Sequence, residues 1–167
     1  RQLTLAKPWL RLPVAAAFDK YGSKSMNAAL ATDSFDETMA LDIEPNLGDP
    51  GPVFVYDYPV PHGALARRNP RDPLLAERFE LYIAGIELCN GFSELRDAVE
   101  QRKRFQKELQ IRRALGKPAY PMPESFLEAL TAMPAAAGNA LGIDRLVMLF
   151  ADTDNIDDVV AFTPEEL

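Results

Sequence analysis

The apolar residues of the chain form short groups separated by proline and glycine, and the spacing inside each group indicates its conformation. Residues 53–58 are rich in β-branched and aromatic side chains, which favours a strand that Pro59 ends. The same reasoning predicts β structure over residues 78–97 and a strand of small residues over 135–141. The apolar group at 159–162 predicts a further strand at the edge of the sheet.

Helical patterns occur between these strands. Proline is favoured at the first position of a helix and glycine directly after its end, so residues 13–21, followed by Gly22, are predicted to be helical. Asp33 or Ser34 is expected to cap a second helix that runs to about residue 47. Further helices are predicted over residues 98–115, 124–133 and 142–150. The expected fold is therefore of the α+β class, an antiparallel β-sheet flanked by helices.

The segment 62–76 is predicted to be a loop with exposed and mobile arginines. These are Arg67, Arg68 and Arg71. His62, the single histidine of the chain, lies between a proline and a glycine, which favours a loop residue over a catalytic one. The basic residues between 102 and 117 are expected to form the solvated face of a helix, with a binding patch as the less favoured alternative.

The composition of the chain argues against several classes of function. The 167 residues carry a net charge of −7, which argues against a protein that binds nucleic acids independently of sequence. No apolar run approaches the roughly 20 residues that cross a bilayer, so no membrane partner is expected. The single cysteine, Cys89, excludes an internal disulfide framework and is typical of the reducing cytoplasm. Because the chain begins with Arg1 and no signal-like segment follows, we expect a piece of a longer protein.

Carboxylates gather in the segment 78–95, which is predicted to be a β-hairpin. A two-residue turn at residues 84–85 would place Glu80 opposite Cys89. Because side chains alternate along a strand, Glu87 shares a face with Cys89, so Glu80 and Glu87 would project from one face as diagonal neighbours. Neighbouring carboxylates repel each other unless a cation lies between them, and Mg²⁺ bound to phosphate oxygens is a natural occupant of such a pair.

Glu94 would point to the opposite face of a regular strand, because it lies seven residues after Glu87. A bulge at Asn90 and Gly91 would bring it to the face of the other two glutamates. The spacing leaves two alternatives open. Asn90 and Gly91 could themselves form a hairpin turn, or the glutamates could simply line the solvent face of a sheet.

The segment 138–150 is a predicted strand of small residues that runs into a helix with Arg145 in its first turn. Glycine and alanine allow a flat ligand to approach the strand backbone closely. Five hydrophobic residues follow Arg145, so its charge is expected to have a specific partner. The alternative is a surface pair between Asp144 and Arg145.

These segments, in this order, resemble the C-terminal half of the catalytic domain of class II aminoacyl-tRNA synthetases of the lysyl type. The segment 138–150 resembles motif 3 of that class, whose arginine contacts the phosphates of ATP. Residues 78–80 and 87–94 resemble the strand pair that supplies metal and lysine ligands. The resemblance covers about residues 10–165.

Within this family, residues 76–82, 85–88 and 140–142 are more similar to the branch that joins β-lysine to a lysine of translation elongation factor P. Lysyl-tRNA synthetases usually have glycine where this chain has Ala140, and a methyl group there would reshape the floor of the amino-acid pocket. The resemblance thus implies lysine or β-lysine and elongation factor P as partners, with tRNA less expected. The alternatives are a fragment of a tRNA-charging lysyl-tRNA synthetase and a synthetase-like binding module without chemistry.

The resemblance also implies ATP and Mg²⁺ as cofactors and assigns roles to individual residues. Those expected to border ATP are Glu87, Leu88, Gly142 and Arg145, with Arg145 on the γ-phosphate. Those expected to hold Mg²⁺ are Glu80 and Glu87. Those expected at the amino acid are Glu94, which would take its ammonium group, and Asn90 and Ala140, which would shape its pocket. The expected catalytic residues are Arg145 and Glu87.

The implied chemistry is adenylation, which needs no protein nucleophile. The substrate carboxylate attacks the α-phosphate, pyrophosphate leaves, and the acyl group passes to an acceptor amine, with catalysis by positioning and charge stabilisation. Motif 1, which makes the dimer contact, and motif 2, whose arginine grips the α-phosphate, are not found in residues 1–60. We therefore expect residues 1–167 to hold half of the active site of a homodimeric protein, and to lack adenylation activity alone.

Overall fold

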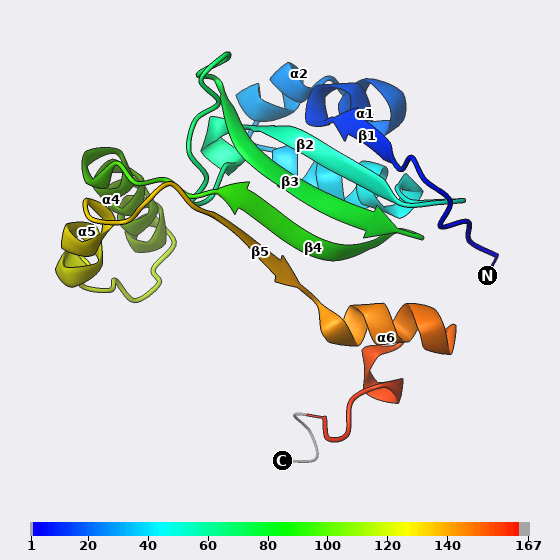
Figure 1. The fold of residues 1–167 in the computed structure, drawn as a ribbon. Helices are drawn as coiled ribbons and strands as arrows, with labels where there is room; N and C mark the ends of the chain where they lie inside the picture. Colours follow the sequence, from blue (N-terminus) through cyan, green and yellow to red (C-terminus); the bar gives the residue numbers. More distant parts are fainter. Residues whose placement is uncertain (1, 164–167) are drawn as a thin grey trace.

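A five-stranded sheet organises the chain, as the computed structural model of residues 2–163 shows (Figure 1). The strands lie side by side in chain order: β1 (Leu10–Pro13), β2 (Val53–Pro59), β3 (Leu75–Ile83), β4 (Ile86–Ser93) and β5 (Ala137–Leu141). β1 runs parallel to β2, and the other neighbours are antiparallel. Residue 1 and residues 164–167, which the predicted domain of 1–167 includes, lie outside the described residues.

The helices occupy three places around this sheet (Figure 1). One face is covered by α1 (Val14–Tyr21), α2 (Met26–Ala31) and α3 (Phe35–Thr38), which continues as the π-helical turn η1 (Met39–Ile43) and the 3₁₀ turn η2 (Glu44–Asn46). The pair α4 (Ala98–Ala114) and α5 (Glu124–Leu130) lies beyond one end of β5, and α6 (Ile143–Ala151) follows its other end. Short 3₁₀ turns are η3 (Val60–His62) and η4 (Ile156–Asp158). None of the helices within residues 2–163 has both the length and the apolar character that crossing a membrane requires.

The two faces of the sheet bury different clusters. On the face covered by α1–α3, the rings of Phe18 and Phe35 stack with 5.0 Å between centroids and belong to one core with Val53 and Val55 of β2. The opposite face buries a second cluster, partly covered by α6: Leu81, Ile83, Leu88 and Cys89. Side chains alternate between these two environments along β3 and β4, except that the consecutive residues Leu88 and Cys89 both belong to the second cluster.

The α+β class and most of the predicted elements are confirmed. α1, β2, α4, β5 and α6 begin and end within two residues of their predicted bounds. The edge strand predicted at 159–162 is wrong, because these residues form a turn and a bend and pair with no strand among residues 2–163. β1 was not predicted, since its four residues are too short to show an alternating pattern, and its parallel pairing makes the sheet mixed. α2 was also missed, although Ser25 caps it by accepting a hydrogen bond from the Ala28 N–H at 3.3 Å.

The helix predicted to end near residue 47 is present but irregular. Pro45 has no N–H to donate, and its ring would clash with a carbonyl one turn earlier, which accounts for a π-helical turn followed by a 3₁₀ turn instead of a regular α-helix. The segment ends at Gly48, whose φ of +80° favours glycine. A Cβ at Gly48 would lie 2.6 Å from the Ile83 Cα, and the Gly48 carbonyl accepts from the Ala84 N–H at 2.8 Å. The helical segment is thus docked against the β3–β4 turn.

The loop expected at 62–76 is present up to the start of β3, and its three arginines are exposed as predicted. Two of them are nevertheless held by partners. Arg67 pairs with Glu77 of β3, and Arg68 Nη2 lies 2.9 Å from a carboxylate oxygen of Glu100 on α4. These contacts connect the loop to the sheet and to α4.

Candidate functional site

The β3–β4 hairpin carries most of the predicted site residues. Its turn at residues 84–85 has positive φ at both positions, 52° and 77°, which is typical of a type I′ turn and confirms the predicted turn. Further along, Glu80 lies opposite Asn90 and not opposite Cys89, so the predicted pairing is wrong. The extra residue that shifts the register is Leu88.

The bulge at Leu88 has the effect that we expected from a bulge further along the strand. β5 pairs with residues 89–93 without interruption, so neither a bulge nor a turn forms in that stretch. Glu80, Glu87 and Glu94 consequently all belong to the face of the sheet that α1–α3 cover.

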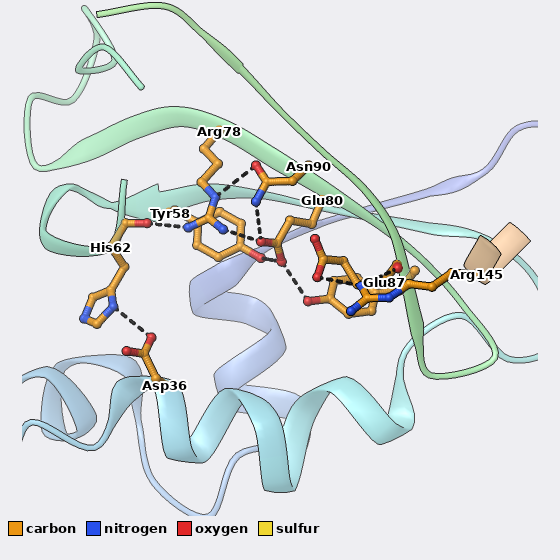
Figure 2. A network of polar contacts seen from close by, with 9 residues as sticks. Asp36, Tyr58, His62, Arg78, Glu80, Glu87, Asn90 and Arg145 are labelled. Atoms are coloured by element: carbon orange, nitrogen blue, oxygen red, sulfur yellow. Dashed lines mark hydrogen bonds and ion pairs between the residues drawn. The ribbon is translucent and has the colours of Figure 1, made fainter. Parts of the chain in front are cut away.

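Glu80 is a buried carboxylate whose two oxygens accept hydrogen bonds from four side chains (Figure 2). Its Oε2 accepts from the hydroxyls of Tyr58, at 2.5 Å, and Tyr82, at 2.7 Å. Its Oε1 accepts from Asn90 Nδ2, at 3.0 Å, and from Arg78 Nη2. The donors come from β2, β3 and β4, and only 7% of the Glu80 side chain is exposed.

Arg78 is itself fixed by several contacts (Figure 2). Its Nη1 donates to the main-chain carbonyl of His62 at 2.6 Å, its Cζ lies 4.4 Å from the centroid of the Tyr58 ring, and its Nε donates to Asn90 Oδ1 at 3.4 Å. His62 Nδ1 lies 3.0 Å from an oxygen of Asp36, which holds the loop residue against α3. His62 was predicted to be a loop residue, but it is the last residue of the 3₁₀ turn η3, and its carbonyl supports Arg78.

Burial changes the acidity of the groups around Glu80. Burial, with a further contribution from the charge of Glu80, raises the pKa of Tyr58 and also that of Tyr82. Both hydroxyls therefore stay protonated near neutral pH and remain hydrogen-bond donors to the carboxylate.

Glu44 is a carboxylate near this network to which sequence reasoning assigned no role. It is half-buried at the start of η2, and burial followed by the charge of Glu80 raises its pKa. A hydrogen bond with Tyr82 and the charge of Arg145 lower this pKa, and the charge of Glu87 raises it. Its position depends on the docking of η2 against the hairpin turn, which no local pattern in the sequence reveals.

Arg145 in the first turn of α6 contacts Glu87 of β4 (Figure 2). Its Nη1 donates to the Glu87 carbonyl at 2.9 Å and to Glu87 Oε2 at 3.2 Å. The expectation of a specific partner for Arg145 is confirmed, and that partner is not Asp144. The start of α6 is joined to the same strand by the Gly142 N–H, which donates to the Leu88 carbonyl at 2.8 Å.

A hollow of about 340 Å³ lies between β4, the end of β5 and the start of α6. Six of the eight predicted site residues line it: Glu87, Leu88, Asn90, Ala140, Gly142 and Arg145. Two do not, since Glu80 lies in the buried network and Glu94 lies further along β4.

The predicted substrate residues are arranged along the pair of strands β4 and β5. Asn90 is directly opposite Ala140, and both line the hollow. Glu94 follows the end of β4, and a Cβ added at Gly138 would lie 2.7 Å from its Oε1. The carboxylate of Glu94 thus occupies space that a side chain at Gly138 would need.

Comparison with known families decides the relationship of this chain. The sequence pattern of the family described as tRNA synthetases class II (D, K and N) matches residues 1–166. The chain belongs to the class II tRNA synthetase family.

Among its similar relatives in this class are proteins named elongation factor P–(R)-β-lysine ligase. The one from Erwinia tasmaniensis is 49% identical over 124 residues, which cover 74% of this chain and 38% of the relative. The one from Edwardsiella ictaluri is 46% identical over 125 residues, with the same coverage. The one from Proteus mirabilis is 47% identical over 121 residues, covering 72% and 37%. The matched part of the chain thus spans about 38% of the length of these relatives.

The donor set of this class II synthetase chain can be tested against the expected magnesium ion. Within residues 2–163, no group of three or more His, Cys, Asp or Glu side chains is arranged to hold a metal. Glu87 is partly exposed in the hollow and could contribute an oxygen. Both oxygens of Glu80 already accept two hydrogen bonds each, so Glu80 does not fit the role of its partner.

Proposed function

We propose that the full-length protein containing this chain is a ligase that activates lysine or β-lysine with ATP and transfers it to a lysine of elongation factor P. The observation that carries the proposal is the 44–49% identity to relatives that bear the name of such a ligase. The matched family and the hollow beside Arg145 support it.

In this proposal the hollow between β4 and α6 receives ATP. Glu87 engages Arg145 through Nη1 alone, so the guanidinium, which is 49% exposed, has donors at its other nitrogens for a phosphate oxygen. Gly142 and Leu88 border the nucleotide through their main chain. As the substrate carboxylate attacks the α-phosphate and pyrophosphate leaves, Arg145 stabilises the charge that develops on the phosphates.

Magnesium, when bound, would neutralise phosphate charge, and Glu87 is the residue of the hollow that would contact it. Arg145 and Glu87 are the proposed catalytic residues, and the mutual contact between them keeps the guanidinium at the wall of the hollow.

The amino acid is proposed to lie along β4. Asn90 and Ala140 would shape its pocket, and Glu94 would bind its ammonium group by charge. The methyl group of Ala140 lies at the position where lysyl-tRNA synthetases usually have glycine, and this supports β-lysine over α-lysine.

The chain is proposed to supply only part of the active site, because its match covers about 38% of the relatives. We expect residues 1–167 alone to show no amino-acid-dependent exchange of pyrophosphate into ATP. We also expect the full-length protein to be a homodimer, which light scattering on the purified protein would test.

The decisive experiment measures that exchange for the full-length protein with α-lysine and (R)-β-lysine, followed by transfer of the labelled amino acid to elongation factor P. The expected result is exchange that is faster with β-lysine, and label on the factor. Exchange with neither amino acid would reject adenylation and leave a binding module.

A second candidate function is tRNA charging, because the matched family is described by tRNA synthetases. The same labelled amino acid is offered to tRNA in a parallel reaction. Label on tRNA with a preference for α-lysine would replace the first proposal with this one.

A further inference from the structure

We propose that Glu80 is a positioning residue that fixes the side-chain amide of Asn90 in the substrate pocket, rather than a ligand of magnesium. This inference rests on the proposed function, since it concerns the binding of the amino acid. It starts from the observation that the Glu80 carboxylate is 7% exposed and accepts from Tyr58, Tyr82, Arg78 and Asn90.

A carboxylate offers about four lone-pair positions, and at Glu80 four donors occupy them. A metal ion could bind only if one of these donors left the carboxylate. Tyr82 also hydrogen-bonds to Glu44, but Tyr58 would be left buried without its acceptor. Tyr58 and Tyr82 cannot turn to water easily, because their side chains are almost entirely buried. The network is therefore complete without a metal.

The network determines which way the amide of Asn90 faces. Its Nδ2 donates to Glu80 and its Oδ1 accepts from Arg78 Nε, so exchanging the two amide atoms would place donor against donor at Arg78. One N–H and one lone pair of the amide are left over from these two contacts. Asn90 lines the hollow, and in this proposal these remaining groups are the ones that meet the substrate.

The exchange Glu80→Gln separates positioning from metal binding. A glutamine whose oxygen accepts from the tyrosines presents its NH₂ group to Arg78 and Asn90. The amide of Asn90 must then turn to accept, which breaks its contact with Arg78 Nε. A neutral amide in place of the carboxylate would also be a poor magnesium ligand. A role in metal binding therefore predicts an effect only when magnesium is present, whereas a role in positioning Asn90 predicts an effect without magnesium as well.

The test is calorimetric binding of β-lysine, and of α-lysine, to the full-length protein in EDTA without ATP. We expect Glu80→Gln to weaken binding about tenfold, as the loss or reversal of one hydrogen bond to the ligand would. If Glu80 acted through magnesium alone, binding in EDTA would be unchanged, and this result would overturn the inference. If the unaltered protein bound neither amino acid, the proposed function itself would fail.

A double-mutant cycle distinguishes positioning from general damage to the fold. With Asn90→Ala as the background, Glu80→Gln should cause no further loss of binding, because the group that it positions is gone. Losses that multiply would show that Glu80 acts independently of Asn90 and would overturn the inference. If Glu80→Gln does not fold, Arg78→Lys takes its place in the test. This substitution keeps a cation beside Glu80 but loses the Nε contact to Asn90, and it should weaken binding in EDTA by less than Glu80→Gln. Unchanged binding by that variant would equally count against the inference.

Discussion

Glu80 and Glu87 lie on the same face of one hairpin, seven residues apart, and yet their surroundings differ. Glu80 is 7% exposed and has four side-chain donors, whereas Glu87 is 32% exposed and has one, Arg145. Glu80 holds three strands together and borders a hollow of about 480 Å³ on the side of α3, whereas Glu87 lies at the edge of the sheet and borders the hollow beside Arg145. The difference in burial and in number of donors thus indicates a structural role for Glu80 and a ligand-facing role for Glu87.

The largest effect on activity is expected at Arg145, beside the edge of the sheet. Arg145→Ala in the full-length protein should lower kcat/KM for amino-acid-dependent pyrophosphate exchange about 100-fold, because a cation aimed at the phosphates is lost. Arg113→Ala is the matched control, since Arg113 is exposed on α4, away from the hollow, and should leave the rate unchanged. Equal losses in both variants would mean that Arg145 has no special role.

The next prediction contrasts the two glutamates directly. Glu80→Ala should lower the free energy of unfolding by about 3 kcal/mol, because four donors lose a buried acceptor. Glu87→Ala should lower it by less than about 1 kcal/mol, since its ion pair with Arg145 is partly exposed. Urea denaturation of both full-length variants measures these differences. Similar losses of stability in the two variants would contradict the proposed difference between Glu80 and Glu87.

The interior network also predicts a response to alkaline pH. Tyr58 and Tyr82 have a pKa above the ordinary 10.0 in the folded protein, so above pH 10 the unfolded state binds fewer protons than the folded state. The free energy of unfolding should therefore fall as pH rises, by about 1.4 kcal/mol per pH unit for each tyrosine. Urea denaturation between pH 9 and about 11 tests this, and Tyr82→Phe should reduce the slope. A slope unchanged by the substitution would contradict the assignment.

The smallest effect is expected at Glu44, which lies near both carboxylates. Its pKa is raised above 4.5 by burial and by Glu80, so the unfolded state releases its proton first and the free energy of unfolding falls as pH rises past 4.5. Glu44→Gln removes this effect and should stabilise the protein at pH 7 by a few tenths of a kcal/mol, a gain limited by the partial exposure of the group. The same variant at pH 4, where the carboxyl is largely protonated in both states, serves as the control. A loss of stability at pH 7 would show that the Glu44 charge is compensated.

The sequence allowed the hairpin turn, the major helices and the gathering of glutamates to be predicted, because these depend on local patterns. The position of the bulge did not follow from local patterns. Asn90 and Gly91 look suited to a bulge, but β5 pairs continuously with this stretch and leaves no room for an extra residue. Gly91 is needed for a different reason, since a Cβ there would lie 2.6 Å from the Phe79 ring. The extra residue is accommodated at Leu88, before the ladder with β5 begins.

The role of Glu80 could not be predicted from local sequence patterns either. Tyr58 lies 22 residues before it, and the alignment of the two residues depends on a register between β2 and β3 that shifts between Tyr56 and Tyr58. By contrast, Arg145 was expected to have a partner because a charged residue before an apolar run rarely lacks one. The partner itself is Glu87, 58 residues before Arg145, and the local pattern did not identify it.

The bulge at Leu88 gives the hairpin one residue to spare. Leu88 and Cys89 both belong to the cluster beside α6, so the strand takes up an extra residue there without turning over. Removing residue 88 would restore regular alternation and leave Asn90 and Glu94 on the face of Glu80 and Glu87. Removing a residue between 89 and 93 would instead interrupt the ladder with β5 and send Glu94 to the opposite face. Variation in the length of β4 is therefore tolerated at position 88 and not beyond it.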